Sequence, residues 1–116
     1  MRDTTTTNHD VLAALALLHV PHPDRLTDRQ RAGSACVFSG IPLTVTGATD
    51  LGPRATTTRH GDPVSWYPRA HRGEIPRAAL AALHAHAPGC APCRDRATLD
   101  DCPTGAALRR LMKEYR

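Results

Sequence analysis

The chain has 116 residues, a length that suits one modest domain, with a formal net charge of +4 and 41% hydrophobic residues. Aromatic residues make up only 3%, so its small, alanine-rich core would gain from a metal that staples it. The mild positive charge permits contact with nucleic acid or an acidic partner without requiring either. The longest apolar run, residues 11–20, falls far short of the ~20 residues that a membrane span needs.

The flanks of this apolar run argue against a signal peptide. Asp3 and Asp10 cancel the charge of Arg2, and the segment from Pro21 to Pro23 is not a small-residue cleavage site. We therefore expect a cytoplasmic protein that makes no membrane contact. In a reducing compartment, cysteines at metal-like spacing are more often ligands than disulfide partners.

The N-terminal part of the chain predicts a tail followed by a helix. Residues 1–7 are polar and low in complexity, which is typical of a disordered segment. Asn8, or the rival cap Thr7, is expected to start a helix with a broad apolar face that runs to about residue 19.

A second, short helix is expected at about residues 28–32. Thr27 and Gln30 have the spacing of a capping box, in which the glutamine side chain reaches back to the residue that caps the helix. Gly33 follows directly and is expected to end this helix.

The middle of the chain reads as β-structure. Short runs of β-branched and aromatic residues between turn signals predict strands, at residues 35–38, 43–46, 54–59 and 64–67. The last two flank the turn at residues 60–63 and are expected to form a hairpin. Trp66 and Tyr67 are neighbours on one strand and so point to opposite faces, and one of them should lie in the core.

Two further helices are expected near the C-terminus. The first begins at Pro76, runs to about residue 87 and should bury three apolar side chains, Leu80, Leu83 and Ala87. The second should be capped by Thr104 and cover residues 105–115, with one apolar stripe made by Leu108, Leu111, Met112 and Tyr115.

The segment between these helices carries the strongest chemical signal in the sequence. Cys90 and Cys93 form a C-x-x-C motif, Cys102 follows, and His86 precedes, with His84 as a rival. Three thiolates and one imidazole are a ligand set that tetrahedral Zn²⁺ favours in closed structural sites. A redox C-x-x-C is the alternative, but that motif belongs to a thioredoxin-like βαβ context, which the sequence does not show. We therefore predict that these four residues bind zinc.

A second, altered site is predicted around Cys36. The segment Cys36-Val37-Phe38-Ser39-Gly40 has the shape of a zinc knuckle in which Ser39 occupies the second cysteine position. His71 and Glu74 then precede the helix that starts at Pro76, so a knuckle, a hairpin and a ligand pair follow in the order of a treble-clef finger. Together the elements predict an α+β fold of about four helices around a short antiparallel sheet, in one zinc-stapled domain covering residues 8–116.

These motifs resemble those of a group of small, largely uncharacterised actinobacterial zinc-binding proteins. The matching pieces, which span roughly residues 30–112, are Cys36-Val37-Phe38-Ser39-Gly40, Asp50-Leu51-Gly52-Pro53-Arg54, Trp66-Tyr67-Pro68-Arg69-Ala70 and His86-Ala87-Pro88-Gly89-Cys90-Ala91-Pro92-Cys93. The resemblance implies zinc and a shared fold but no particular activity. This chain departs from the group at three apparent cysteine positions, which hold Ser39, His71 and Glu74.

The altered site permits three interpretations. Zinc has been lost there and Cys36 is a buried thiol, which is the interpretation we favour. Alternatively, Cys36, His71 and Glu74 hold a catalytic zinc whose open position Ser39 serves as a hydrogen-bond donor. In the third, the same three residues form a metal-free catalytic trio.

The function that the sequence favours is a small accessory or interaction protein with one structural zinc site. The sequence does not identify its partner and is compatible with a protein partner or a small-molecule substrate. An enzyme of a bacterial specialised pathway that uses Cys36, His71 and Glu74 is the second hypothesis. A regulator that binds nucleic acid is the third, and it is not favoured because acidic residues dilute the basic patches.

Overall fold

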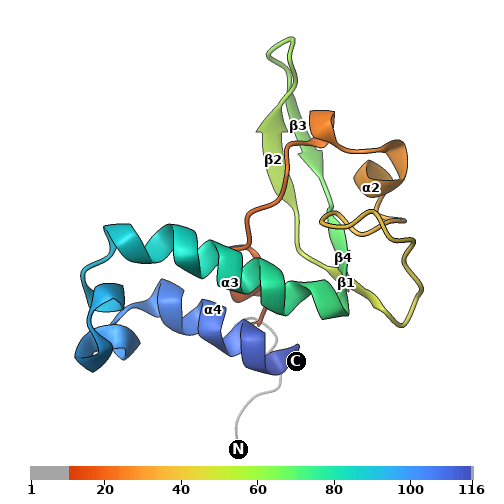
Figure 1. Cartoon of the computed structure of the whole chain (residues 1–116). Helices are drawn as coiled ribbons and strands as arrows, with labels where there is room; N and C mark the ends of the chain where they lie inside the picture. The colour runs from red at the N-terminus through yellow and green to blue at the C-terminus, as the bar shows by residue number, and fades with distance from the viewer. Residues whose placement is uncertain (1–10, 116) are drawn as a thin grey trace, which may run out of the picture. The chain divides into compact units, whose positions relative to one another are not determined.

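The computed structural model describes residues 11–115 (Figure 1). The chain divides into two compact units, each described by itself. The helical unit comprises residues 11–19 and 75–115 of the described chain, and the strand unit comprises Val20–Glu74. The predicted tail and the cap at Asn8 or Thr7 lie outside the described residues, and the prediction of one domain stays a prediction.

The helical unit contains two long helices, α3 (Ile75–His86) and α4 (Pro103–Glu114), which lie side by side and run in opposite directions (Figure 1). Three short 3₁₀ helices connect them: η3 (Ala87–Gly89), η4 (Pro92–Arg94) and η5 (Arg96–Asp101). Residues 11–15 are also helical and contribute Ala14, Leu15 and Leu18 to the buried residues of this unit. None of the helices described in residues 11–115 has the length and hydropathy to cross a membrane.

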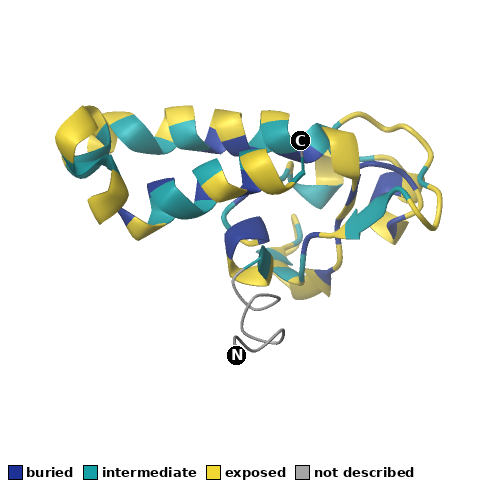
Figure 2. Ribbon diagram, turned by 90° about the horizontal axis from the view of Figure 1, so that it is seen from below, coloured by how far each residue is buried: buried dark blue, intermediate teal, exposed yellow. Residues whose placement is uncertain are grey.

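The buried face of α3 has one large residue, Ile75 at its start, and is otherwise made of small residues. Ala79 and Ala82 are buried, while Leu80 is 42% exposed, so the prediction that Leu80 faces inward was wrong. The predicted stripe on α4 is confirmed at its centre, where Leu108 and Leu111 are each 1% exposed. The buried positions recur along both helices (Figure 2). Alanine on one helix lets the backbones approach closely, so the leucines of the other fill the space between them.

The strand unit holds two separate two-stranded antiparallel sheets. Strand β1 (Ala48–Asp50) pairs with β4 (Arg69–His71), and β2 (Arg54–Thr57) pairs with β3 (Pro63–Trp66). The predicted hairpin is therefore confirmed, and so is the split of its aromatic pair, with Trp66 8% and Tyr67 60% exposed.

The other two predicted strands were wrong. Residues 35–38 and 43–46 are turns and loops, with one isolated bridge between Ala35 and Pro42. The Cys36 carbonyl accepts the Gly40 N–H at 2.8 Å and closes a turn, and the Val37 N–H makes a single bond to the Arg69 carbonyl at 2.9 Å rather than a strand ladder. The α+β class is nevertheless as predicted, with two small antiparallel sheets and several helices.

Helix α2 (Asp28–Ala32) begins with the predicted capping box. The Gln30 N–H donates to the Thr27 hydroxyl at 3.2 Å, and the Thr27 N–H donates to the Gln30 amide oxygen at 2.9 Å. Gly33 ends the helix with a positive φ of 84°, a conformation that glycine adopts without strain. The amide nitrogen of Gln30 also donates to the carbonyls of Cys36 at 3.0 Å and Val37 at 3.4 Å. One buried side chain thus joins α2 to the turn at Cys36.

This second role of Gln30 can be separated from the cap by substitution. Glutamate at position 30 keeps an oxygen for the Thr27 N–H but places a carboxylate against the Cys36 and Val37 carbonyls. We expect Gln30→Glu to lower the free energy of unfolding by about 1–3 kcal/mol in urea denaturation, because two buried acceptors lose their donor. Arg29→Gln, at an exposed position of the same helix, is the control. Equal stability of the two variants would show that the amide bonds contribute nothing.

Candidate metal centre

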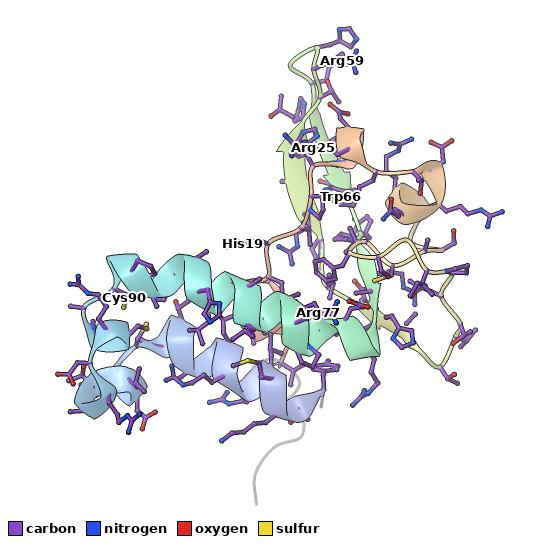
Figure 3. The ribbon with its side chains drawn as sticks, in the orientation of Figure 1. His19, Arg25, Arg59, Trp66, Arg77 and Cys90 are labelled. Carbon is purple, nitrogen blue, oxygen red and sulfur yellow. The ribbon has the colours of Figure 1, made fainter. Side chains whose placement is uncertain are left out.

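Four side chains converge at the end of the helical unit where the 3₁₀ turns lie. His86 is the last residue of α3, Cys90 and Cys93 lie in the turns, and Cys102 directly precedes α4. One nitrogen of His86 and the three sulfur atoms all lie within 4.8 Å of one another. Figure 3 shows Cys90 at this turn end of the helix pair. The side chains that the sequence predicted as zinc ligands are thus brought together.

The spacing of the ligand atoms fits tetrahedral zinc. The His86 Nε2 lies 3.3 Å from the Cys102 Sγ, and the Cys90 Sγ lies 3.6 Å from the Cys102 Sγ. Ligands at normal Zn–S and Zn–N lengths stand about 3.8 Å apart for two sulfurs and about 3.5 Å apart for sulfur and nitrogen. A disulfide would need sulfurs about 2.05 Å apart, and all four cysteines are free thiols.

The local sequence explains how the cysteines reach this position. Proline occupies the first turn of both η3 and η4, where its fixed φ suits a tight helical turn and its missing N–H is not needed. The Cys90 N–H donates to the Ala87 carbonyl at 3.0 Å, which closes the first turn. The Thr98 hydroxyl donates to the Pro92 carbonyl at 3.0 Å and ties the second turn to η5. The predicted end of this helix, at about residue 87, is confirmed, since α3 ends at His86.

Cys102 has two roles. Its sulfur accepts a hydrogen bond from the Gly105 N–H at 3.4 Å, so Cys102 is the N-cap of α4. The predicted cap, Thr104, was wrong, because the helix begins earlier, at Pro103. The hydrogen bond from Gly105, followed by that from His86, lowers the pKa of the Cys102 thiol to about 6. Cys102 is therefore a thiolate at neutral pH, which is the form that binds metal.

The pKa of the Cys93 thiol is shifted in the opposite direction to that of Cys102. Burial, followed by hydrogen bonds with Cys90 and Cys102, raises the pKa of the Cys93 thiol to about 11. In the absence of a cation, the site therefore keeps a proton on Cys93 while Cys102 is ionised. A divalent cation bound between the sulfurs would replace that proton and offset the repulsion between thiolates.

The structure distinguishes the two candidate histidines. His86 belongs to the group through its Nε2 atom, whereas His84 is exposed and lies outside the group. Helical geometry explains the difference, because residues two apart on a helix point to different sides.

The residues predicted to form the altered site around Cys36 are not brought together as the four residues at His86 are. Cys36 is fully buried, Ser39 is exposed, and the Ser39 hydroxyl accepts the Ile41 N–H at 3.4 Å. His71 is exposed and its Nδ1 accepts the Gly73 N–H at 3.0 Å, while Glu74 is half-buried. In residues 11–115, the group at His86 is the sole set of three or more such ligands within metal-binding distance. Cys36, His71 and Glu74 do not form one, and their catalytic roles stay predictions.

Sequence reasoning missed two residues that shape the metal centre. Gly105 sits in the first turn of α4, where a β-carbon would lie 2.8 Å from the Cys93 sulfur. Thr98 fixes the C-x-x-C turn through its hydroxyl. A glycine inside a strongly amphipathic helix was a readable signal of close approach, whereas no pattern marked Thr98.

No protein-family model, curated protein or solved structure matches this chain. The geometry and chemistry of the four side chains are therefore what indicates a metal centre. The resemblance to the actinobacterial group stays a prediction.

Gly105 offers a test in which helix propensity and site geometry predict opposite signs. Alanine favours a helix over glycine by ~1 kcal/mol, so propensity alone predicts that Gly105→Ala stabilises the protein. We expect the reverse, a lower melting temperature and at least roughly tenfold weaker zinc binding, because the Cys93 sulfur must move away from the new methyl group. Thr104→Ala, in the same turn but not the cap, should leave both properties nearly unchanged. Stabilisation by Gly105→Ala would contradict the close approach.

The pKa values also predict how zinc affinity depends on pH. Between pH 7 and 8 Cys93 is protonated, being below its pKa of about 11, and must release its proton on binding, whereas Cys102 is already ionised. Apparent affinity should therefore rise by at least about tenfold per pH unit in this range. Below pH 6 the dependence should steepen as Cys102 is protonated too. Competition with a chromophoric chelator measures this, and an affinity independent of pH would contradict it.

Proposed function

We propose that this chain is a zinc-binding protein whose Cys3His site is structural and whose role is that of an accessory or interaction module. The observation that carries the proposal is the convergence of His86, Cys90, Cys93 and Cys102 to within 4.8 Å. Three soft sulfur donors and one imidazole favour zinc over calcium and magnesium, which prefer oxygen ligands.

A structural role fits the number of protein ligands. Catalytic zinc usually has three protein ligands and keeps one position for water or substrate, whereas four protein ligands complete the tetrahedron. The four side chains are also partly shielded from solvent: Cys102 is 7% exposed and the other three are half-buried. Nothing in this ligand set leaves room for a reacting group.

Zinc here would join the end of α3 to the start of α4. Residues 87–101 between the ligands form only short 3₁₀ turns, and none of them is buried. Such a segment gains little from apolar burial, so the metal would be the main force that orders it. Zinc binding by small zinc-finger peptides contributes about 10–16 kcal/mol, as much as the whole stability of an ordinary domain.

The exposed surface of the helical unit supports an interaction role. With a closed metal site, the outer surfaces of the helices are the part of this unit that can meet a partner, and Leu80 on α3 is 42% exposed. Free thiols at all four cysteines support a location in the reducing cytoplasm. Membership of the actinobacterial zinc-binding group is part of the same proposal and rests on the sequence motifs.

Metal stoichiometry tests the proposal directly. Native mass spectrometry with elemental analysis of the reduced protein should find one zinc per chain. Cys102→Ser should lose it while keeping an oxygen that can cap α4, so the loss reports the ligand rather than the helix. Cys36→Ala, which removes a cysteine of the strand unit, is the matched control and should keep one zinc.

Three results would contradict this proposal or a part of it. Protein without zinc after purification and after reconstitution would overturn the proposal. Two zinc ions per chain, with one lost in Cys36→Ala, would move the function to the altered site. Removal of the single zinc by a strong chelator should lower the melting temperature, and an unchanged melting temperature would contradict a structural role.

A further inference from the structure

The strand unit contains a small cavity that the metal centre does not involve. Its volume is about 290 Å³, at the lower end of the range for sites that hold small organic molecules. Apolar side chains from the end of α2, from the loop before β1 and from the start of β1 form part of its wall: Ala32, Leu43, Val45 and Ala48. Such a wall suits the hydrocarbon part of a ligand.

One charged side chain lines this cavity, that of Arg69 on β4. Its cross-strand neighbour is Asp50, yet the Asp50 carboxylate accepts the Gly52 N–H at 2.8 Å and forms no ion pair with Arg69. No carboxylate in residues 11–115 lies within ion-pairing distance of the Arg69 guanidinium. The planar guanidinium therefore has its donors available for an anion.

Arg69 is an exposed residue, and in residues 11–115 its guanidinium has no ion-pair partner, but its backbone and stem are held by neighbours. Its carbonyl accepts the Val37 N–H at 2.9 Å, which fixes the backbone. Its stem lies against Gly33, where a β-carbon would come within 2.9 Å of the Arg69 Cδ. The glycine that ends α2 thus makes room for this side chain. An arginine whose stem already packs on a neighbour loses less conformational entropy when its guanidinium binds a ligand.

The hydroxyl groups of the lining complete the pattern of donors. Thr44 accepts the Gly47 N–H on its Oγ1 at 3.0 Å, so its own proton remains for another acceptor. Ser34 donates its hydroxyl proton to the Arg29 carbonyl at 3.2 Å. The cavity therefore offers donors from Arg69 and Thr44 beside an apolar wall, and it contains no carboxylate.

From this arrangement we propose that the cavity binds a small organic carboxylic acid. The carboxylate would pair with the Arg69 guanidinium, the geometry in which arginine makes two parallel hydrogen bonds, and would accept from the Thr44 hydroxyl. The hydrocarbon part would lie against Leu43 and Val45. A single cation suits a monoanion better than a phosphate dianion. This proposal does not depend on the metal centre, whose residues belong to the other unit.

Nuclear magnetic resonance of the isotope-labelled, zinc-loaded protein tests the site, with sodium benzoate as the probe. Benzoate should shift the backbone amide signals of Gly33, Ser34, Thr44 and Val45 in a saturable manner. Benzamide has the same shape without the charge and should bind at least roughly tenfold more weakly, because it cannot form the charged pair. Equal binding of the two, or saturation by chloride at the same concentration, would overturn the proposal.

Two substitutions make the test specific. Arg69→Met keeps most of the stem that packs on Gly33 and should abolish saturable binding. Arg59→Met, at the tip of the β2–β3 hairpin (Figure 3), removes the same charge from the same unit and should bind benzoate as the unsubstituted protein does. Unchanged binding by Arg69→Met, or equal loss in both variants, would contradict the proposed role of Arg69.

A third variant keeps the test valid if Arg69→Met unfolds. Val45 is 96% exposed at the cavity, so Val45→Asp should fold normally. Its carboxylate would compete for the Arg69 guanidinium and repel an incoming anion, and benzoate binding should fall at least roughly tenfold. Binding that is unaffected in a well-folded Val45→Asp protein would place benzoate elsewhere and overturn the assignment.

Discussion

Crowding of thiol groups is the constraint on which the helical unit depends. Three sulfurs share a small space with one imidazole nitrogen, and the sulfurs cannot all be thiolates at once unless a cation lies between them. The opposite pKa shifts of Cys102 and Cys93 show this conflict directly. Around it, prolines shape the turns, and α3 and α4 supply the apolar contact that holds the two sides together. A chain with so few aromatic residues has little other means to order this end of the unit.

In the strand unit, the neutral side chain of Gln30, rather than a metal, holds a turn. The turn at Cys36 resembles a zinc knuckle in sequence, but the Gln30 amide binds its Cys36 and Val37 carbonyls. Hydrogen bonds from a capping-box residue thus hold a turn that a metal holds in true knuckles. These hydrogen bonds make serine rather than cysteine at position 39 structurally tolerable, and they agree with the full burial of Cys36.

Local signals predicted much of this structure. The capping box at Thr27 and Gln30, the hairpin and the ligand spacing each depend on residues close in sequence, and each is found as expected. The β1–β4 pairing was missed because its strands are only three residues long and join segments about 20 residues apart. The inward face of α3 was predicted wrongly because hydrophobicity alone favours burial of Leu80. Packing against α4 instead buries the smaller Ala79 and Ala82. A cysteine is not among the usual helix caps, so Cys102 gave no warning of that role.

That double use of Cys102 has a thermodynamic consequence. Because one sulfur both belongs to the ligand group and receives the first-turn N–H of α4, the two events share an atom and cannot be independent. If a cation binds these sulfurs, linkage requires that its effect on the start of α4 equal the effect of that helix start on the affinity for the cation. Exchange of the Gly105 amide proton with solvent would then report metal occupancy at this turn.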